Sequence, residues 1–340
     1  MKVLVYIIES RHLNQSGETE ERIRRIVQKA GSHVTFADNH EEAIQEIEDA
    51  DILFGDITPE MFKNAKRLKW IQAPISSFGK ANGEYYIFHE LTQSDIMLTS
   101  MSGIYSDVIA THVFAFITSF ARDFPKLLRN QTLRVWDRDV KIVSLQGKIL
   151  GVVGLGGVGK QVARIGAAFG MRVIAAEPNP QNIPLFVEKI WDPGDLKGLL
   201  KEADFVVLCI PDAPGTVNLI GVEELKSMKR TAYLINIGRG RTVDLDALTH
   251  TLKSGGIAGA GLDVFPPSSE PLPSGHPLWA MENVIITPHR ASHGISIERR
   301  VDVFLENFDR YVQGKVLLNV VDKKSMVLTG PGYSLPFINT

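Results

Sequence analysis

Cysteine is the scarcest residue in this chain, with one copy, Cys209, among 340 residues. A single cysteine excludes an intrachain disulfide framework. Cys209 stands inside the apolar run "DFVVLCI", where a thiol behaves as a small hydrophobic side chain. We therefore interpret it as a core residue rather than as a redox centre.

An excess of charge of one sign is also lacking, because 37 Lys and Arg face 39 Asp and Glu. So balanced a composition creates no strong field toward nucleic acid or a membrane surface. No apolar run approaches the roughly 20 residues that span a bilayer, and the opening "MKVLVYIIESR" is typical of a strand rather than of a signal peptide. We expect a cytoplasmic protein. We expect no metal site either, since His289 and His293 are spaced four apart without a third ligand.

The length of 340 residues exceeds the ~250–300 at which single hydrophobic cores stop growing, so two domains are expected. Short apolar runs alternate with amphipathic helical stretches from the N-terminus, and this alternation restarts at "LQGKILGVVG". Such an order is typical of α/β folds with doubly wound parallel sheets. Two longer helices are predicted over residues 107–122 and 296–313. In the first of them, helical spacing indicates core packing for Phe114, Phe116 and Phe120.

A glycine cluster lies in the stretch "VVGLGGVGKQVARIGAAFGMRVIAAEP". Its members Gly154, Gly156 and Gly159 form a G-x-G-x-x-G pattern between a strand-like run and a helical run. In a Rossmann unit the first glycine makes a tight turn, the second lets the backbone approach a pyrophosphate, and the third lets the helix pack on the strand. The pyrophosphate then accepts from backbone N–H groups at the helix N-terminus, here those of Gly157 and Val158.

An acid, Glu177, ends the next predicted strand, 18 positions after Gly159. A carboxylate there accepts hydrogen bonds from the adenosine ribose and repels a 2′-phosphate, so NAD rather than NADP is the predicted cofactor. The competing interpretation is a turn without a ligand and a solvated Glu177.

Three further motifs follow the glycine cluster in order: "NIGRGRTVD" at 236–244, "GLDVFPPSSEPLP" at 261–273 and "NVIITPHRAS" at 283–292. With this order and spacing, the chain resembles the D-isomer-specific 2-hydroxyacid dehydrogenases, in particular those similar to glyoxylate and hydroxypyruvate reductases. The resemblance implies two Rossmann-like doubly wound domains and a homodimer formed through the cofactor domains.

The same resemblance implies a division of the chain. The NAD-binding domain (104–290) would be inserted into a split, flavodoxin-like substrate domain (1–103 and 291–325), and residues 326–340 would form a C-terminal tail.

Three side chains are the predicted catalytic group. A planar guanidinium grips a carboxylate in two places, and by resemblance Arg239 is the arginine that does so. His289 would exchange the proton with the carbonyl oxygen, because an imidazole changes its charge near neutral pH. Glu270 is its predicted partner, since a carboxylate beside the ring stabilises the charged imidazole. The family usually has this glutamate five positions after Asp263, which here is Ser268; we choose Glu270 because "EPLP" matches the motif after a two-residue insertion.

Other site residues are implied by resemblance. Asp263 would contact the nicotinamide end, and the loop "CIPDAPGT" would lie on the adenine side unless it only shapes a turn. The predicted cofactor contacts in this second half of the domain are Ile210, Pro211, Thr216, Ile237, Gly238, Arg239, Asp263 and His289. The predicted substrate contacts, besides Arg239, are backbone amides near Ser77, Phe78 and Gly79.

The predicted activity is the NAD-dependent interconversion of a small 2-keto acid and its D-2-hydroxy acid. Glyoxylate, hydroxypyruvate and D-lactate-type reactions are the leading candidates. The length disfavours a phosphoglycerate enzyme with a regulatory domain, and Glu270 disfavours formate oxidation, for which the family uses glutamine. An NAD(H)-binding sensor or corepressor-like protein of the same fold is the alternative.

Overall fold

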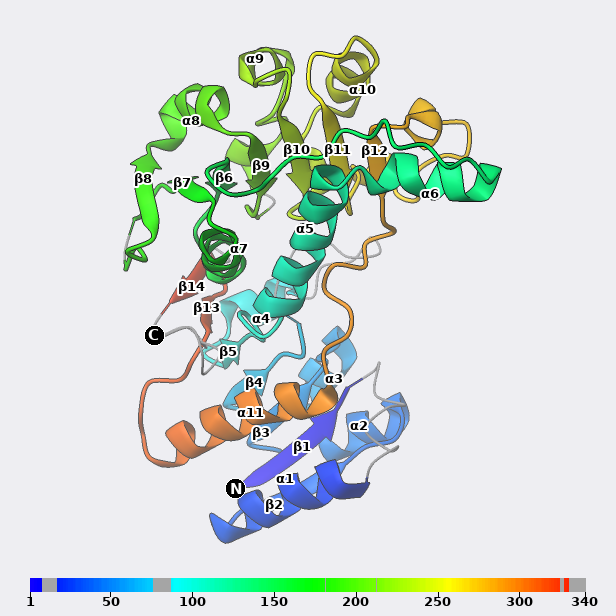
Figure 1. The fold of residues 1–340 in the computed structure, drawn as a ribbon. Coiled ribbons are helices and arrows are strands. Elements are labelled where there is room, and N and C mark those ends of the chain that lie inside the picture. Colours follow the sequence, from blue (N-terminus) through cyan, green and yellow to red (C-terminus); the bar gives the residue numbers. More distant parts are fainter. Residues whose placement is uncertain (8–16, 76–86, 181, 212, 325–326, 330–340) are drawn as a thin grey trace. The chain divides into compact units, whose positions relative to one another are not determined.

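The computed structural model describes residues 1–7, 17–75, 87–180, 182–211, 213–324 and 327–329 (Figure 1). The chain divides into two compact units. The split unit comprises Met1–Ile104 with Ile295–Thr340, and the inserted unit comprises Tyr105–Gly294. Which unit binds the substrate stays a prediction.

The split unit is built on a seven-stranded sheet with the order β14-β13-β5-β4-β3-β1-β2. The strands are β1 (Lys2–Tyr6), β2 (His33–Phe36), β3 (Ile52–Gly55), β4 (Trp70–Gln72), β5 (Met97–Thr99), β13 (Val320–Asp322) and β14 (Val327–Thr329). Strands β1 to β5 pair in parallel, as the alternating pattern predicts. The antiparallel strands β13 and β14 extend the edge of this sheet, so part of the predicted tail is a strand.

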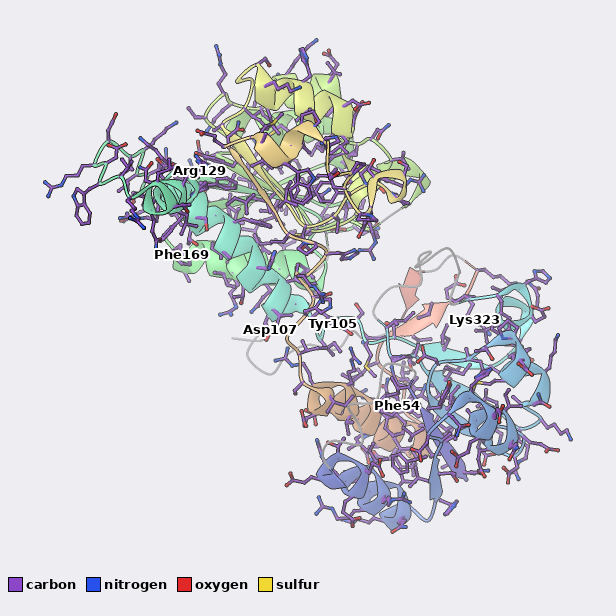
Figure 2. The ribbon with its side chains drawn as sticks, turned by 90° about the vertical axis from the view of Figure 1, so that its right-hand side faces the viewer. Phe54, Tyr105, Asp107, Arg129, Phe169 and Lys323 are labelled. Atoms are coloured by element: carbon purple, nitrogen blue, oxygen red, sulfur yellow. The ribbon has the colours of Figure 1, made fainter. Side chains whose placement is uncertain are left out.

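Helices cover both faces of this sheet: α1 (Gly17–Lys29), α2 (His40–Glu46), α3 (Pro59–Asn64), α4 (His89–Gln93) and α11 (Ile297–Val312). Leu53 of β3 packs in a core with side chains of α2, α3 and α4. Its neighbour Phe54 points to the other face, where it stacks on Phe304 of α11 with ring centroids 4.5 Å apart (Figure 2). Successive strand residues therefore serve opposite cores.

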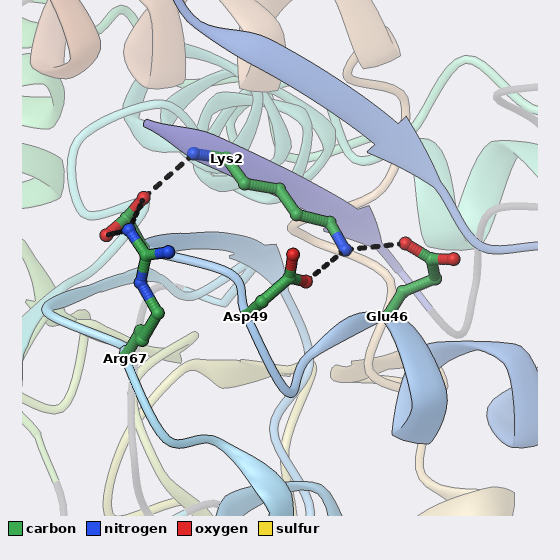
Figure 3. Close-up of polar contacts among 5 residues, drawn as sticks. Lys2, Glu46, Asp49 and Arg67 are labelled. Atoms are coloured by element: carbon green, nitrogen blue, oxygen red, sulfur yellow. Dashed lines mark hydrogen bonds and ion pairs between the residues drawn. The ribbon is translucent and has the colours of Figure 1, made fainter.

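Charged side chains form an ion-pair network at the start of β1. The Lys2 ammonium lies 2.7 Å from Glu46 and 2.5 Å from Asp49 (Figure 3). The Lys2 backbone N–H donates to Asp51, which is 2% exposed and also accepts from the Arg67 guanidinium. Burial acts to raise the pKa of the Asp51 carboxyl, but these two donors outweigh it, so the pKa lies below its ordinary value.

We expect Asp51→Asn to lower the free energy of unfolding of this unit by about 1–3 kcal/mol at neutral pH, because the buried network loses its negative charge and one of two acceptor oxygens. A carboxyl with a lowered folded pKa stabilises the fold above its unfolded pKa, about 3.9, and this contribution disappears as the pH falls through the folded value. Chemical denaturation should therefore show the difference between wild type and variant shrinking from pH 6 to pH 3. Glu21→Gln, at an exposed position of α1, is the control; a pH-independent difference for Asp51→Asn would contradict the assignment.

The inserted unit contains a second seven-stranded sheet, of order β12-β11-β10-β9-β6-β7-β8. Its strands are β6 (Ile149–Val153), β7 (Arg172–Ala176), β8 (Val187–Trp191), β9 (Phe205–Leu208), β10 (Tyr233–Asn236), β11 (Gly259–Leu262) and β12 (Val284–Ile286). Every pairing is parallel. This is the doubly wound order, in which the chain reverses direction across the sheet between β6 and β9 and ligands bind at that point.

Two layers of helices cover this sheet: α5 (Ser106–Ala121) and α7 (Gly157–Ala168) on one face, α8 (Leu196–Glu202), α9 (Val222–Ser227) and α10 (Leu245–Lys253) on the other (Figure 1). Residues of β9 alternate between the two cores, with Val207 on the α5 and α7 side and Val206 opposite. The three phenylalanines of α5 are buried in the first of these cores. Their core role is thus confirmed.

Helix α6 (Phe124–Leu133) was not predicted. It has no buried residue and lies on the surface of the inserted unit. Arg129 of α6 pairs with Glu282 at 3.4 Å (Figure 2). Across the described ranges, no helix combines the length and apolarity needed to cross a membrane.

Candidate active site

The predicted site residues of the inserted unit follow six parallel strands. The carboxyl ends of parallel strands meet at one edge of a sheet, so residues distant in sequence gather there. The glycine loop follows β6, Glu177 follows β7, and Ile210 and Pro211 follow β9. Arg239 follows β10, Asp263 follows β11 and His289 follows β12.

The three glycines of the cluster have different surroundings. Gly154 has φ +93°, a conformation that side chains rarely adopt. A Cβ on Gly159 would lie 1.9 Å from the Gly154 carbonyl oxygen, so α7 packs directly on this turn. A Cβ on Gly156 would meet no described atom within 4 Å. The loop thus leaves open space in front of the first turn of α7, whose N–H groups have no acceptor within the helix. A dinucleotide pyrophosphate fits this arrangement.

Glu177 is held against the glycine loop. Its Oε2 accepts the N–H of Leu155 at 2.8 Å, and its Oε1 accepts the N–H of Asn179 at 3.1 Å. The carboxylate is half-buried and anchored by the backbone, with further lone pairs for hydroxyl donors.

The adenine-side loop is a compact turn. The Thr216 hydroxyl accepts the N–H of Ala213 at 2.9 Å and lies 2.9 Å from the Pro211 carbonyl oxygen. Thr216 therefore shapes the turn by itself, and contacts of Ile210, Pro211 and Thr216 with a cofactor stay predictions. Cys209, which precedes this loop, packs against the core, and burial raises the pKa of its thiol to about 12, which keeps it protonated.

Arg239 begins a tight loop after β10. The side chain of buried Asn236 accepts the N–H of Gly238 at 3.1 Å and donates to the Arg239 carbonyl oxygen at 3.0 Å. Thr242 also donates its hydroxyl to that carbonyl, at 2.6 Å. The backbone of Arg239 is therefore fixed on both sides, while its side chain is half-buried. Sequence reasoning missed Asn236, although it opens the motif "NIGRGRTVD".

His289 and Glu270 are brought together. The imidazole Nδ1 lies 2.8 Å from Glu270 Oε1, whereas the alternative, Ser268, lies in the short 3₁₀ turn Pro267–Ser269. A carboxylate only accepts, so Nδ1 carries a proton and Nε2 is the nitrogen that gains or loses one. The histidine side chain is 52% exposed, so Nε2 is accessible for proton exchange.

Asp263 faces inward, with 1% exposure. Its Oδ1 accepts the Thr287 hydroxyl at 2.5 Å and the N–H of Arg290 at 2.8 Å, and its Oδ2 accepts the N–H of Ala291 at 2.9 Å. The carboxylate thus holds the chain on both sides of His289. This structural contact was not predicted, and the expected contact of Asp263 with the nicotinamide stays a prediction.

The predicted substrate loop, with Ser77, Phe78 and Gly79, lies outside the described residues. Arg239, the other predicted substrate contact, is described above and stays a prediction.

Comparison with known proteins identifies the family of this chain. Residues 114–291 match the model for the NAD binding domain of the D-isomer specific 2-hydroxyacid dehydrogenases. The chain belongs to that family. This dehydrogenase is 33% identical over 307 residues to a glyoxylate reductase from Aeropyrum pernix, covering 86% of this chain and 89% of the relative.

Solved structures agree with this assignment. A D-isomer specific 2-hydroxyacid dehydrogenase from Lactobacillus delbrueckii ssp. bulgaricus, in an NAD complexed form, has a TM-score of 0.76 and 26% identity over 94% of this chain and 100% of its own. One from Xanthobacter autotrophicus Py2, in complex with NADPH and MES, has a TM-score of 0.76 and 28% identity over 96% of this chain and 99% of its own. The two Rossmann-like domains with mainly parallel sheets, the dehydrogenase class and NAD as cofactor are therefore confirmed for this enzyme, whose substrates are small 2-keto and 2-hydroxy acids.

Proposed function

We propose that the enzyme reduces a small 2-keto acid such as glyoxylate or hydroxypyruvate to the D-2-hydroxy acid, with Arg239 and the His289–Glu270 pair as its catalytic residues. The observation that carries the proposal is the 2.8 Å contact between His289 and Glu270 at the sheet edge that also holds the glycine loop. The substrate-binding role of the split unit belongs to the same proposal.

Arg239 holds the substrate carboxylate. The guanidinium is planar and donates two parallel hydrogen bonds to two carboxylate oxygens, which fixes the adjacent carbonyl group. Because Asn236 and Thr242 hold the Arg239 carbonyl oxygen, the side chain starts from a rigid backbone. Orientation of this kind lowers the barrier by removing motion before the chemical step.

His289 supplies the proton. Bound NADH supplies the hydride that reduces the carbonyl carbon. As negative charge develops on the carbonyl oxygen, protonated Nε2 donates to it, and the Nδ1–H bond to Glu270 keeps the ring in place. In the oxidation direction, neutral Nε2 accepts the hydroxyl proton.

A substrate panel tests the proposal. With NADH and a series of 2-keto acids, we expect turnover that is fastest for glyoxylate or hydroxypyruvate and weaker for pyruvate, followed as loss of absorbance at 340 nm. The proposal is supported by the A. pernix relative, a glyoxylate reductase. Tight NADH binding without turnover of any member would support the sensor alternative, and a preference for a phosphorylated acid would overturn the substrate choice.

Cofactor selectivity is the next prediction. Glu177 carries a negative charge where a 2′-phosphate would lie, and residues 178–188 contain no Lys or Arg to offset it. We expect kcat/KM to favour NADH over NADPH by about 100-fold, and Glu177→Gln to reduce that ratio by about 10-fold. Gln keeps one oxygen for the N–H of Leu155, so the fold should be retained. A wild-type preference for NADPH would contradict this assignment.

We also propose a homodimer in which a second copy covers the exposed apolar side chains of α6 and of the segment directly after it, which contains Trp136. Large apolar side chains are exposed there, with Trp136 at 89%, and α6 buries none of its residues within the inserted unit. A group of exposed large apolar side chains often marks a protein–protein interface. Light scattering should give twice the mass of one chain, and Trp136→Arg should shift that mass toward one chain. The cytoplasmic location stays a prediction.

A further inference from the structure

His112 contacts the loop of His289 without being part of the proposed chemistry. It lies on α5, 175 residues before Thr287, and its Nε2 is 3.0 Å from the Thr287 hydroxyl oxygen. The Thr287 hydroxyl is in turn 2.5 Å from Asp263 Oδ1, and His112 Nε2 is 3.6 Å from the same oxygen. The three side chains form a continuous polar chain inside the inserted unit.

The direction of each bond follows from the number of protons. An ionised Asp263 only accepts, so Thr287 donates its single hydroxyl proton to Oδ1. The hydroxyl then has only lone pairs left for His112. Nε2 of His112 must therefore carry a proton and donate it to Thr287, whether the ring is neutral or charged.

This series of hydrogen bonds ends at the backbone around His289. The Asp263 carboxylate accepts the Thr287 hydroxyl on one side of His289 and the N–H groups of Arg290 and Ala291 on the other. The Asp263 backbone carbonyl accepts the N–H of His289 itself, at 2.9 Å. His289 itself has φ +55°, a left-handed conformation. For a residue other than glycine this conformation is unfavourable, and it persists only where surrounding contacts hold it.

The ring of His112 is itself held by apolar packing. Its ring centroid lies 4.9 Å from that of Phe116, with an interplanar angle of 89°, and Phe116 is buried. The Phe116 ring lies directly against β11, since a Cβ on Gly261 would come within 2.7 Å of it. Nε2 therefore points in one direction, toward Thr287.

We propose that His112 is a positioning residue for catalysis: through Thr287 and Asp263 it keeps His289 in the left-handed conformation from which Nε2 reaches the substrate. This inference depends on the proposed proton transfer by His289. His112 touches neither the reacting atoms nor Glu270 in this assignment, so its effect is on the geometry of the loop.

A matched pair of variants tests it. In His112→Gln the amide nitrogen reaches about as far as Nε2, so the bond to Thr287 is kept; in His112→Asn the same group is one methylene too short. We expect His112→Asn to lower kcat about 10-fold with the Kd of NADH unchanged, and His112→Gln to stay within about 3-fold of wild type. A purely structural role would reduce thermal stability in both variants without this rescue of kcat.

A double-mutant cycle tests the route. Thr287→Val removes the hydroxyl through which His112 acts, and Thr287→Ser retains it. We expect the double variant His112→Asn/Thr287→Val to have the same kcat as Thr287→Val alone, because one chain of bonds can be broken only once. Multiplied losses, or a His112→Asn enzyme with wild-type kcat, would overturn the inference. Absence of turnover in the wild type with every keto acid would instead refute the proposed function.

Discussion

Replacing His289 by asparagine is expected to lower kcat for keto-acid reduction about 1,000-fold, because the reaction loses its proton donor. The amide can still accept or donate hydrogen bonds but cannot exchange a proton near neutral pH. The Kd of NADH, measured by fluorescence titration, should change little, since α7 and the glycine loop are untouched. Steady-state rates at 340 nm over a range of keto-acid concentrations give kcat and KM separately.

Two comparisons make this result specific. His250→Asn, at an exposed position of α10, removes an imidazole elsewhere in the same unit and should leave kcat unchanged. Glu270→Gln keeps an acceptor for Nδ1–H but removes the charge, so a smaller loss, about 10–100-fold, is expected. A His289→Asn enzyme with kcat near that of the wild type would show that the proton comes from another group.

Replacing Arg239 by lysine is expected to lower kcat/KM for the keto acid at least 100-fold. Lysine keeps the positive charge, but its ammonium is a point charge that cannot grip two carboxylate oxygens in one plane. Both KM and kcat should change. KM rises because substrate binding is weaker, and kcat falls because the carbonyl group is no longer held in line with His289.

The control for this substitution lies at the other end of the same strand. Arg230 precedes β10 and Arg239 follows it, so Arg230→Lys makes the same chemical change away from the site, and its kinetics should match those of wild type. If Arg239→Lys kept full activity, charge alone would suffice and the two-point grip would be wrong. If Arg239→Ala lost activity and added guanidinium ions restored it, the two-point grip would be supported directly.

Much of the fold could be predicted from local pattern. The alternation of apolar runs and amphipathic stretches predicted two doubly wound units, since strands buried on both faces have continuous apolar sequences. Short or exposed elements were missed. Strand β14 has three residues, too few to show the alternation of side chains that marks a strand. Helix α6 shows no periodic burial, because none of its residues is buried.

The candidate site was predicted unevenly for the same reason. Gly154 and Gly159 could be assigned because each meets a requirement set by nearby residues: Gly154 has a positive φ, and Gly159 leaves room for the Gly154 carbonyl oxygen. The choice of Glu270 over Ser268 depended on an alignment with an insertion, which local chemistry alone does not determine. The contact with His289 Nδ1 is made across 19 residues, through a loop whose path no periodic pattern encodes.

The amino-acid sequence by itself thus specified the functional side chains and the strand that each of them follows. These side chains gather because the carboxyl ends of parallel strands lie at one edge of the sheet. Only the folded chain decided which carboxylate meets the imidazole, that His289 adopts a left-handed backbone, and that His112 donates to Thr287 from a helix 175 residues away. These are contacts between segments distant in sequence, and they arise from packing in three dimensions rather than from any repeat along the chain.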